Sequence, residues 1–438
     1  MTEYTKPDIG LLRKSPARKK MTPEEFDRHI ATLQKILESY GIRGKVTYTW
    51  RNPTVTNYTF LPAVGVRIED IRARTEDIAR ALETDNRIMI TQVFRGASEV
   101  NIAIPNNKHN WVHLGDYMRD DKELKINSLA WYFGIDLNHD CHISELGFLC
   151  DMEHVLISGC PETGKSSLLR SLVLSALYTC GPDMCQLVLI DTKDDTFLRC
   201  DGVPHLVMPV AKTVTDGDVA LKFAQNEIKK RLIQRHPIEY EIQPRILVVI
   251  DEVADLMDVS HDKLKYIAQF GARVNVNLVV ATRYIDAVQT IAPYIPTRMV
   301  FRTCTREDSI QCLRAPGAEN LLDYDDMLMS DKQNDLKRIH TFGTGVIELS
   351  RVVYSMTHRQ KTAEDKALFE RAKECVLRED NPTISYLQRS LTIDHDKASE
   401  LMEWLEVEGV VSEPDENGER YVWGPEYPIE VNPTGDDE

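Results

Sequence analysis

Residues 154–167 read HVLISGCPETGKSS, a short apolar segment followed by a glycine-bounded turn. Gly159 and Gly164 bracket four residues, and Lys165 and Ser166 follow directly, which is the spacing of a P-loop. In such a loop, successive backbone N–H groups surround phosphate groups at the positive end of a helix. Leucines then recur at helical spacing, at positions 168, 169, 172, 174 and 177. The sequence therefore predicts a strand, a phosphate-binding loop and a helix in this order.

The residues of this loop have distinct predicted roles. We expect Lys165 to reach the β and γ phosphates of ATP. Ser166 is expected to give a hydroxyl ligand to Mg²⁺, a hard cation that prefers oxygen. The predicted ATP-binding residues are Gly159, Cys160, Pro161, Glu162, Thr163, Gly164, Lys165, Ser166 and Ser167.

The composition limits the classes of protein to which the chain can belong. Its 438 residues suffice for two or three domains, and 42% of them are apolar. No apolar run reaches the roughly 18 to 20 residues that span a bilayer, and the N-terminus lacks the apolar core of a signal peptide. Nine scattered cysteines without a Cys-x-x-Cys pair are typical of a reducing compartment. We therefore expect a cytoplasmic protein without a membrane span.

The formal net charge is -16. This charge argues against a protein that coats nucleic acid nonspecifically, because such binding requires Lys and Arg to neutralise phosphates. It remains compatible with nucleic acid held in a small basic channel.

The sequence pattern divides the chain into six predicted segments. The first is basic, and we expect a solvated, disordered tail, with a contact to DNA phosphates or to an acidic partner as the alternative. Thr22 and Glu25 form a capping box that opens a module of helices and alternating strands. The predicted segments are a basic tail at 1–21, an α+β module at 22–150, an α/β domain with the P-loop at 151–345, a linker at 346–363, a winged-helix domain at 364–424, and an acidic, disordered tail at 425–438.

From residue 151 the pattern alternates between strand and helix, which is typical of a parallel sheet covered on both faces. Continuous apolar runs, as in buried parallel strands, occupy residues 186–191, 245–250 and 277–281. Ligands of such sheets bind at the carboxyl ends of the strands. Lys165, Asp251, Glu252 and Thr282 all follow such strand ends, so we expect them to share one site.

An apolar strand that ends in two carboxylates is the second element of P-loop ATPases, usually called Walker B. Asp251 is predicted to hold the Mg²⁺ shell, directly or through water, and Glu252 to orient and deprotonate the attacking water. Thr282 is a candidate γ-phosphate sensor. Adjacent acids are common on protein surfaces, so the interpretation depends on the preceding strand and on the P-loop upstream.

Hydrolysis also requires a cation that meets the charge of the transition state. Our candidate is Arg298, acting as a finger on the nucleotide of a neighbouring subunit. The alternative for this residue is an ordinary surface salt bridge. Arg302, Arg306 and Arg283 are the remaining candidates.

These residues resemble the motor domain of the FtsK/SpoIIIE double-stranded DNA translocases. The resemblance implies a RecA-like ATPase that forms a hexameric ring around duplex DNA and binds nucleotide between subunits. It covers the preceding α+β module more weakly and the C-terminal region in outline. The matching segments are the P-loop and residues 202–206, 226–231, 249–257, 278–282, 295–298, 317–322 and 326–328.

The chain also departs from this family. Cys160, Pro161 and Glu162 replace the small residues that are usual in the crown of the P-loop. Where the family usually has Ala-Thr-Gln-Arg-Pro, Arg283 follows Thr282, so the sensor glutamine is absent.

Three predicted helices and a hairpin near the C-terminus resemble the winged-helix γ domain of the same family, whose last helix enters the major groove. Here that helix carries His395 and Lys397, the candidate DNA contacts, among acidic residues such as Asp396 and Glu400. Two interpretations remain open: this domain binds DNA in another way, or it docks a protein.

The predicted fold class is therefore α/β: a RecA-like P-loop core, an N-terminal α+β module and a C-terminal winged-helix domain. The predicted function is an ATP-hydrolysing, ring-forming motor that translocates double-stranded DNA, and the resemblance alone implies that the ring is a hexamer. One alternative is an ATPase of the same superfamily that moves protein. The other is a nucleotide-gated scaffold with low turnover.

Overall fold

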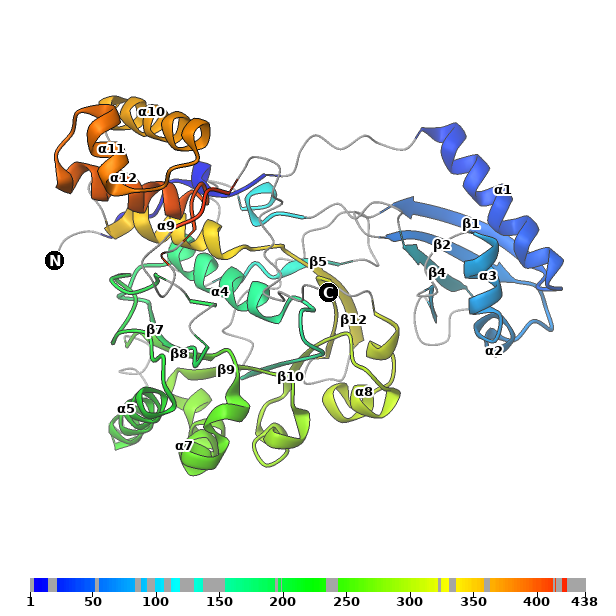
Figure 1. Ribbon diagram of the computed structural model, residues 1–438. Coiled ribbons are helices and arrows are strands. Elements are labelled where there is room, and N and C mark those ends of the chain that lie inside the picture. Colours follow the sequence, from blue (N-terminus) through cyan, green and yellow to red (C-terminus); the bar gives the residue numbers. More distant parts are fainter. Residues whose placement is uncertain are drawn as a thin grey trace, which may run out of the picture. The chain divides into compact units, whose positions relative to one another are not determined.

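The computed structural model describes residues 4–14, 22–51, 55–82, 88–92, 99–105, 112–118, 130–136, 154–193, 196–197, 199–233, 243–321, 324–330, 336–357, 363–412, 414 and 420–423. The chain divides into two compact units, residues 1–344 and 345–438 (Figure 1). Predictions for residues 15–21, for the turn at 415–418 and for the tail at 425–438 lie outside the described residues.

The α+β module contains a four-stranded antiparallel sheet in the order β1-β2-β4-β3. Successive side chains of a strand point to opposite faces of the sheet. On one face, Phe60 of β2 and Ile102 of β4 pack in a core with Leu33 and Leu37 of α1. The elements are α1 (Pro23–Ser39), β1 (Gly44–Arg51), β2 (Val55–Pro62), α2 (Ile68–Arg72), α3 (Thr75–Ala81), β3 (Met89–Gln92) and β4 (Val100–Pro105).

The first described segment, residues 4–14, differs from the predicted disordered tail. The hydroxyl of Tyr4 donates to Leu177 O at 2.7 Å, and Tyr178 donates its own hydroxyl to Asp8 O at 2.9 Å. Leu12 is buried. Leu177 O belongs to the last turn of a helix, whose final carbonyls have no partner inside the helix, so a distant segment can bind there.

The P-loop lies in an eight-stranded sheet with the order β5-β12-β11-β10-β6-β9-β8-β7. Strands β10, β6, β9, β8 and β7 run parallel, and β11, β12 and β5 add an antiparallel edge. The strands are β5 (Gly134–Asp136), β6 (Val155–Ser158), β7 (Cys185–Ile190), β8 (Arg245–Ile250), β9 (Val276–Thr282), β10 (Thr297–Phe301), β11 (Asp326–Ser330) and β12 (Leu336–Thr341).

Helices cover both faces of the parallel strands, with α4 on one side and α5 and α7 on the other (Figure 1). The β8 residues Ile246, Val248 and Ile250 pack into the cluster that includes α5 and α7, whereas Leu247 and Val249, which are also buried, point to the other face. The helices are α4 (Lys165–Thr179), α5 (Val214–Ile233), α7 (Met257–Phe270) and α8 (Arg306–Leu313).

The second unit consists of α9 (Val346–Thr357), α10 (Ala363–Glu379), α11 (Ile384–Leu391) and α12 (His395–Val407). Thr383 and Asp394 cap the N-termini of α11 and α12, and an antiparallel bridge joins Val411 to Val422 after them. The predicted linker at 346–363 thus begins with helix α9 instead of irregular chain. Among the described helices, none combines the length and the apolar character needed to cross a membrane.

Candidate nucleotide site

The P-loop connects β6 to α4, as the sequence predicts, and its two glycines have backbone conformations that other residues rarely adopt. Gly159 has φ +148° and Gly164 has φ +109°. A Cβ atom on Gly159 would lie 2.8 Å from Phe301 Cβ, and one on Gly164 would lie 2.7 Å from Asp325 Oδ1. Glu162 at the crown is exposed and also has a positive φ of 59°. The loop therefore needs glycine at both ends of its four-residue crown.

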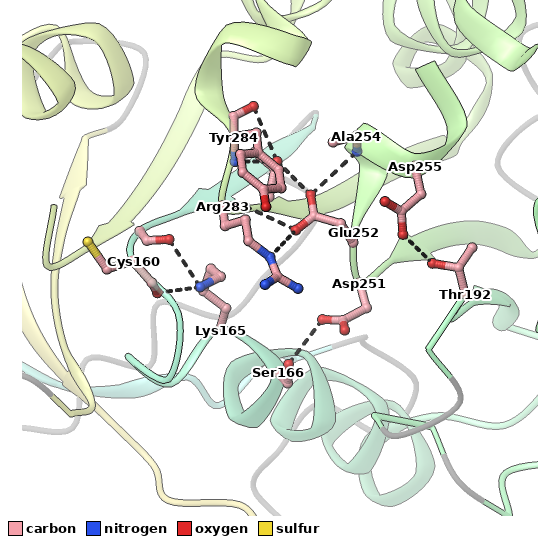
Figure 2. Close-up of polar contacts among 12 residues, drawn as sticks. Cys160, Lys165, Ser166, Thr192, Asp251, Glu252, Ala254, Asp255, Arg283 and Tyr284 are labelled. Carbon is pink, nitrogen blue, oxygen red and sulfur yellow. Dashed lines mark hydrogen bonds and ion pairs between the residues drawn. The ribbon is translucent and has the colours of Figure 1, made fainter. Parts of the chain in front are cut away.

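Lys165 is directed back over the loop, where its amine donates to Gly159 O at 3.1 Å and to Cys160 O at 2.6 Å (Figure 2). Burial lowers the pKa of Lys165 to about 8, and the Arg283 cation adds to this effect, although Glu252 and Asp251 oppose it. The amine thus lies at the loop with hydrogen bonds that phosphate oxygens can replace.

We predict that nucleoside triphosphate binding takes up protons near pH 8. Phosphate oxyanions favour the charged amine of Lys165, so its pKa rises when the ligand binds, and affinity falls as the pH increases from 7 to 9. Calorimetric titration at pH 8 in buffers of different ionisation enthalpy measures this uptake, expected to be about half a proton for each ligand bound. In the Lys165→Arg control the side chain stays charged, so uptake should vanish. Equal uptake in both proteins would contradict the assignment.

The two predicted metal ligands come together from different elements. Ser166 Oγ at the start of α4 donates to Asp251 Oδ1 after β8 at 3.1 Å, and Thr196 Oγ1 donates to Asp251 Oδ2 at 3.1 Å (Figure 2 shows the first contact). Within the described residues, no group of three or more His, Cys, Asp or Glu side chains could hold a metal ion. A hydroxyl beside one carboxylate fits Mg²⁺, which keeps several waters and takes its remaining oxygens from phosphates.

Glu252 is buried beside this pair, and four donors surround its carboxylate (Figure 2). Oε1 accepts from the Thr282 hydroxyl at 2.7 Å and from Ala254 N at 3.4 Å. Oε2 accepts from Arg283 N and from Arg283 Nε, both at 3.2 Å. Burial raises the pKa of Glu252, while the hydrogen bonds from Thr282, Arg283 and Ala254 lower it.

Thr282, the candidate γ-phosphate sensor, is fully buried at the end of β9. Its hydroxyl donates to Glu252 and accepts from Tyr284 N at 2.9 Å. The structure therefore places this hydroxyl against the predicted base, which it orients.

Arg298 is not exposed in this structure as a finger would be, and its role as a finger stays a prediction. Only 3% of the residue is exposed, and its guanidinium donates to Ile295 O at 3.0 Å, Cys312 O at 3.1 Å and Ala292 O at 2.5 Å. Burial lowers its pKa to about 10. Such a side chain ties three backbone segments together and cannot reach another subunit without leaving them. Nor does the surface salt-bridge alternative fit, because the residue is buried.

The other three arginine candidates have different environments in the structure. Arg306 is exposed as the first residue of α8. Arg302 contributes its carbonyl oxygen, which accepts from Cys160 N at 2.8 Å and holds the crown of the P-loop. Arg283 pairs with Glu252.

The candidate DNA contacts lie on α12 of the second unit. Lys397 Nζ donates to Asp365 Oδ1 at 2.8 Å and to Glu400 Oε2 at 2.9 Å, and both contacts raise its pKa. His395 is exposed, with Nδ1 3.8 Å from Asp396 Oδ1. The DNA-binding role of both residues stays a prediction, and acidic neighbours already compensate the charge of Lys397.

Two residues of the site were missed or misjudged from the sequence. The sequence suggests Arg283 only as a finger, although its place directly after Thr282 at a predicted strand end is a usable signal. Asp325 has φ +53° and donates its N–H to Thr163 O at 3.2 Å, and its carboxylate is the group that a Cβ on Gly164 would meet. Its distance along the chain from the P-loop left no local signal.

Three models of known protein families match segments of this chain. The model of the FtsK alpha domain matches residues 7–106, that of the FtsK/SpoIIIE family matches residues 130–235, and that of the FtsK gamma domain matches residues 363–424. The chain belongs to the FtsK/SpoIIIE family. The predicted fold class is thereby confirmed, with the P-loop in the FtsK/SpoIIIE match and α10 to α12 in the gamma match.

Two curated relatives in this family are named DNA translocase FtsK. The protein of Caulobacter vibrioides is 27% identical over 96% of this chain and 60% of its own length, and that of Caldanaerobacter subterraneus is 29% identical over 94% and 63%. The chain thus spans about three fifths of the length of these FtsK relatives. A solved structure of the pCW3 conjugation coupling protein TcpA with ATPγS is similar at a TM-score of 0.45 and 18% identity, over 72% of this chain and 95% of that one.

Proposed function

We propose that this FtsK/SpoIIIE chain is an ATP-hydrolysing motor that forms rings and translocates double-stranded DNA. The observation that carries the proposal is the convergence of Lys165, Ser166, Asp251 and Glu252 at the carboxyl ends of β6 and β8. The name of the curated relatives supports DNA as the substrate.

In the proposed reaction, each residue has one task. The P-loop amides and Lys165 bind the triphosphate, and Ser166 with Asp251 would hold Mg²⁺, which supplies charge neutralisation at the phosphates. Glu252 orients the attacking water and takes its proton, and Thr282 holds the Glu252 carboxylate from the side of β9. The proposal also includes a hexameric ring and a cytoplasmic location. It keeps the division of the chain into six segments, with the linker shortened by α9.

We expect linear duplex DNA to stimulate the steady-state ATPase rate strongly, and the stimulation to vanish in Lys165→Ala. A motor couples hydrolysis to movement along its track, so turnover rises when the track is present. The measurement compares phosphate release by the purified protein with and without DNA. If the protein is folded and binds nucleotide but its ATPase rate does not change with DNA, the proposal is contradicted. The protein-moving or scaffold alternative is then favoured.

In the second unit, Lys397 forms ion pairs with Asp365 and Glu400. This pairing favours a protein-docking role of the unit over DNA recognition. Lys397→Ala serves as a test within the same assay. If α12 reads DNA phosphates, this variant lowers the DNA-stimulated rate. If it docks a protein, the rate with DNA alone stays at the wild-type value.

A further inference from the structure

The guanidinium of Arg283 lies between the predicted base and the P-loop lysine (Figure 2). The Arg283 Nε lies 3.2 Å from Glu252 Oε2. The Cζ atom of Arg283 lies 5.7 Å from the centroid of the Tyr284 ring. The Arg283 side chain is 30% exposed, whereas that of Glu252 is 4% exposed. The pair thus joins a buried carboxylate to a cation at the open side of the site.

The contacts of Glu252 leave no acceptor position for water. An ionised carboxylate has about four lone-pair positions, two on each oxygen. In Glu252, Thr282 and Ala254 occupy those of Oε1, and the two nitrogens of Arg283 occupy those of Oε2. A general base must be within hydrogen-bonding reach of the proton that it removes. In this arrangement Glu252 cannot deprotonate a water, so one contact has to break first.

Of the four donors, the Arg283 side chain is the one that is partly exposed and can move away without a change in the backbone. Ala254 N belongs to the 3-10 turn at Val253–Leu256, which Glu252 caps, and Arg283 N follows directly after β9. The Thr282 hydroxyl is fully buried. The Arg283 side chain, by contrast, is partly exposed and has several rotatable bonds.

A second observation indicates what draws Arg283 away. In Figure 2 the guanidinium of Arg283 and the amine of Lys165 lie on the same side of the site and point toward a common space. Lys165 is already assigned to the β and γ phosphates. An anion that enters this space meets both cations, and guanidinium groups bind phosphate oxygens with paired hydrogen bonds.

We propose that Arg283 is a switch that exchanges the Glu252 carboxylate for the γ-phosphate of the bound triphosphate and so releases the base only when that phosphate is present. This inference rests on the proposed ATPase function and deepens it. A diphosphate lacks the group that competes with Glu252, so it leaves the ion pair closed. A glutamine at this position would be uncharged and could not form the ion pair.

The test measures binding of ATPγS and ADP to the full chain by fluorescence titration, without hydrolysis or DNA. In Arg283→Gln we expect ATPγS affinity to fall about tenfold and ADP affinity to stay unchanged, because only the γ-phosphate loses a partner. In Glu252→Gln we expect the opposite, tighter ATPγS binding with unchanged ADP affinity, since Arg283 no longer has to leave a carboxylate. The double variant should match Arg283→Gln, because the gain acts through Arg283.

Arg273→Gln is the matched control, since Arg273 is exposed in the turn before β9, at the strand end away from the site. Equal losses for ATPγS and ADP in Arg283→Gln would show a merely structural role and overturn the proposal, as would unchanged affinity for both. If the wild type binds neither nucleotide better than Lys165→Ala does, the proposed function itself fails, and the switch fails with it. Normal binding without the ATPγS-specific effects removes the switch alone.

Discussion

Glu252→Gln is expected to keep nucleotide binding and to lose hydrolysis. Glutamine has nearly the same shape, so the contacts with the Thr282 hydroxyl and with the backbone N–H of Arg283 can persist in part. Its amide cannot accept a proton from water, and loss of a general base lowers a rate by roughly 10² to 10⁴-fold. Single-turnover hydrolysis of radiolabelled ATP measures the chemical step apart from binding.

Asp255→Asn is the matched control for this prediction. Asp255 lies three residues further on, and its carboxylate accepts from the Thr192 hydroxyl at 2.6 Å, with no hydrogen bond to Glu252 among the described contacts. We expect its hydrolysis rate to stay within a few-fold of wild type. A Glu252→Gln variant that hydrolyses ATP at a comparable rate would remove Glu252 from the role of base.

Arg298→Ala is expected to lower the free energy of unfolding of the P-loop domain by about 3 kcal/mol. Three buried backbone carbonyls lose a charged donor, at about 1.5 to 3 kcal/mol each, and this loss is partly offset because a guanidinium is no longer desolvated. Urea titration followed by hydrogen exchange of peptides from residues 292–313 reports stability at this place.

Arg314→Asn is the control for that measurement. Arg314 is an exposed cation at the end of α8 with φ +63°, a conformation that asparagine tolerates. We expect the exchange midpoint of this variant to stay close to wild type. If Arg298→Ala unfolds like the wild type and loses only hydrolysis, Arg298 acts as a finger after all and our structural assignment is wrong.

The sequence predicts the positions of the candidate nucleotide-site residues where these positions depend on short motifs. Gly159, Gly164 and Lys165 lie in one loop, and the spacing fixes their relation. Asp251 and Glu252 end an apolar strand, and parallel strands bring their carboxyl ends to one edge. Local pattern and sheet topology together therefore bring Lys165, Asp251 and Glu252 to one edge of the sheet without any knowledge of side-chain contacts.

The same reasoning fails where a side chain chooses among distant partners. The three acceptors of Arg298 come from residues 292, 295 and 312, and nothing next to Arg298 in the sequence shows that they surround it. Tyr4 likewise binds a carbonyl more than 170 residues away, so a basic N-terminal segment gave a misleading composition signal. Tertiary packing decides such cases, and composition or periodicity does not report it.

The central claim is movement along double-stranded DNA, and displacement of a fluorescent third strand from linear duplexes tests it most directly. A translocating motor needs longer to reach the third strand when that strand lies farther from the DNA end. We predict that the wild type with ATP shows a lag that grows in proportion to this distance, and that Glu252→Gln displaces nothing. Vigorous ATP hydrolysis without displacement, or displacement with a lag that ignores distance, would contradict the account.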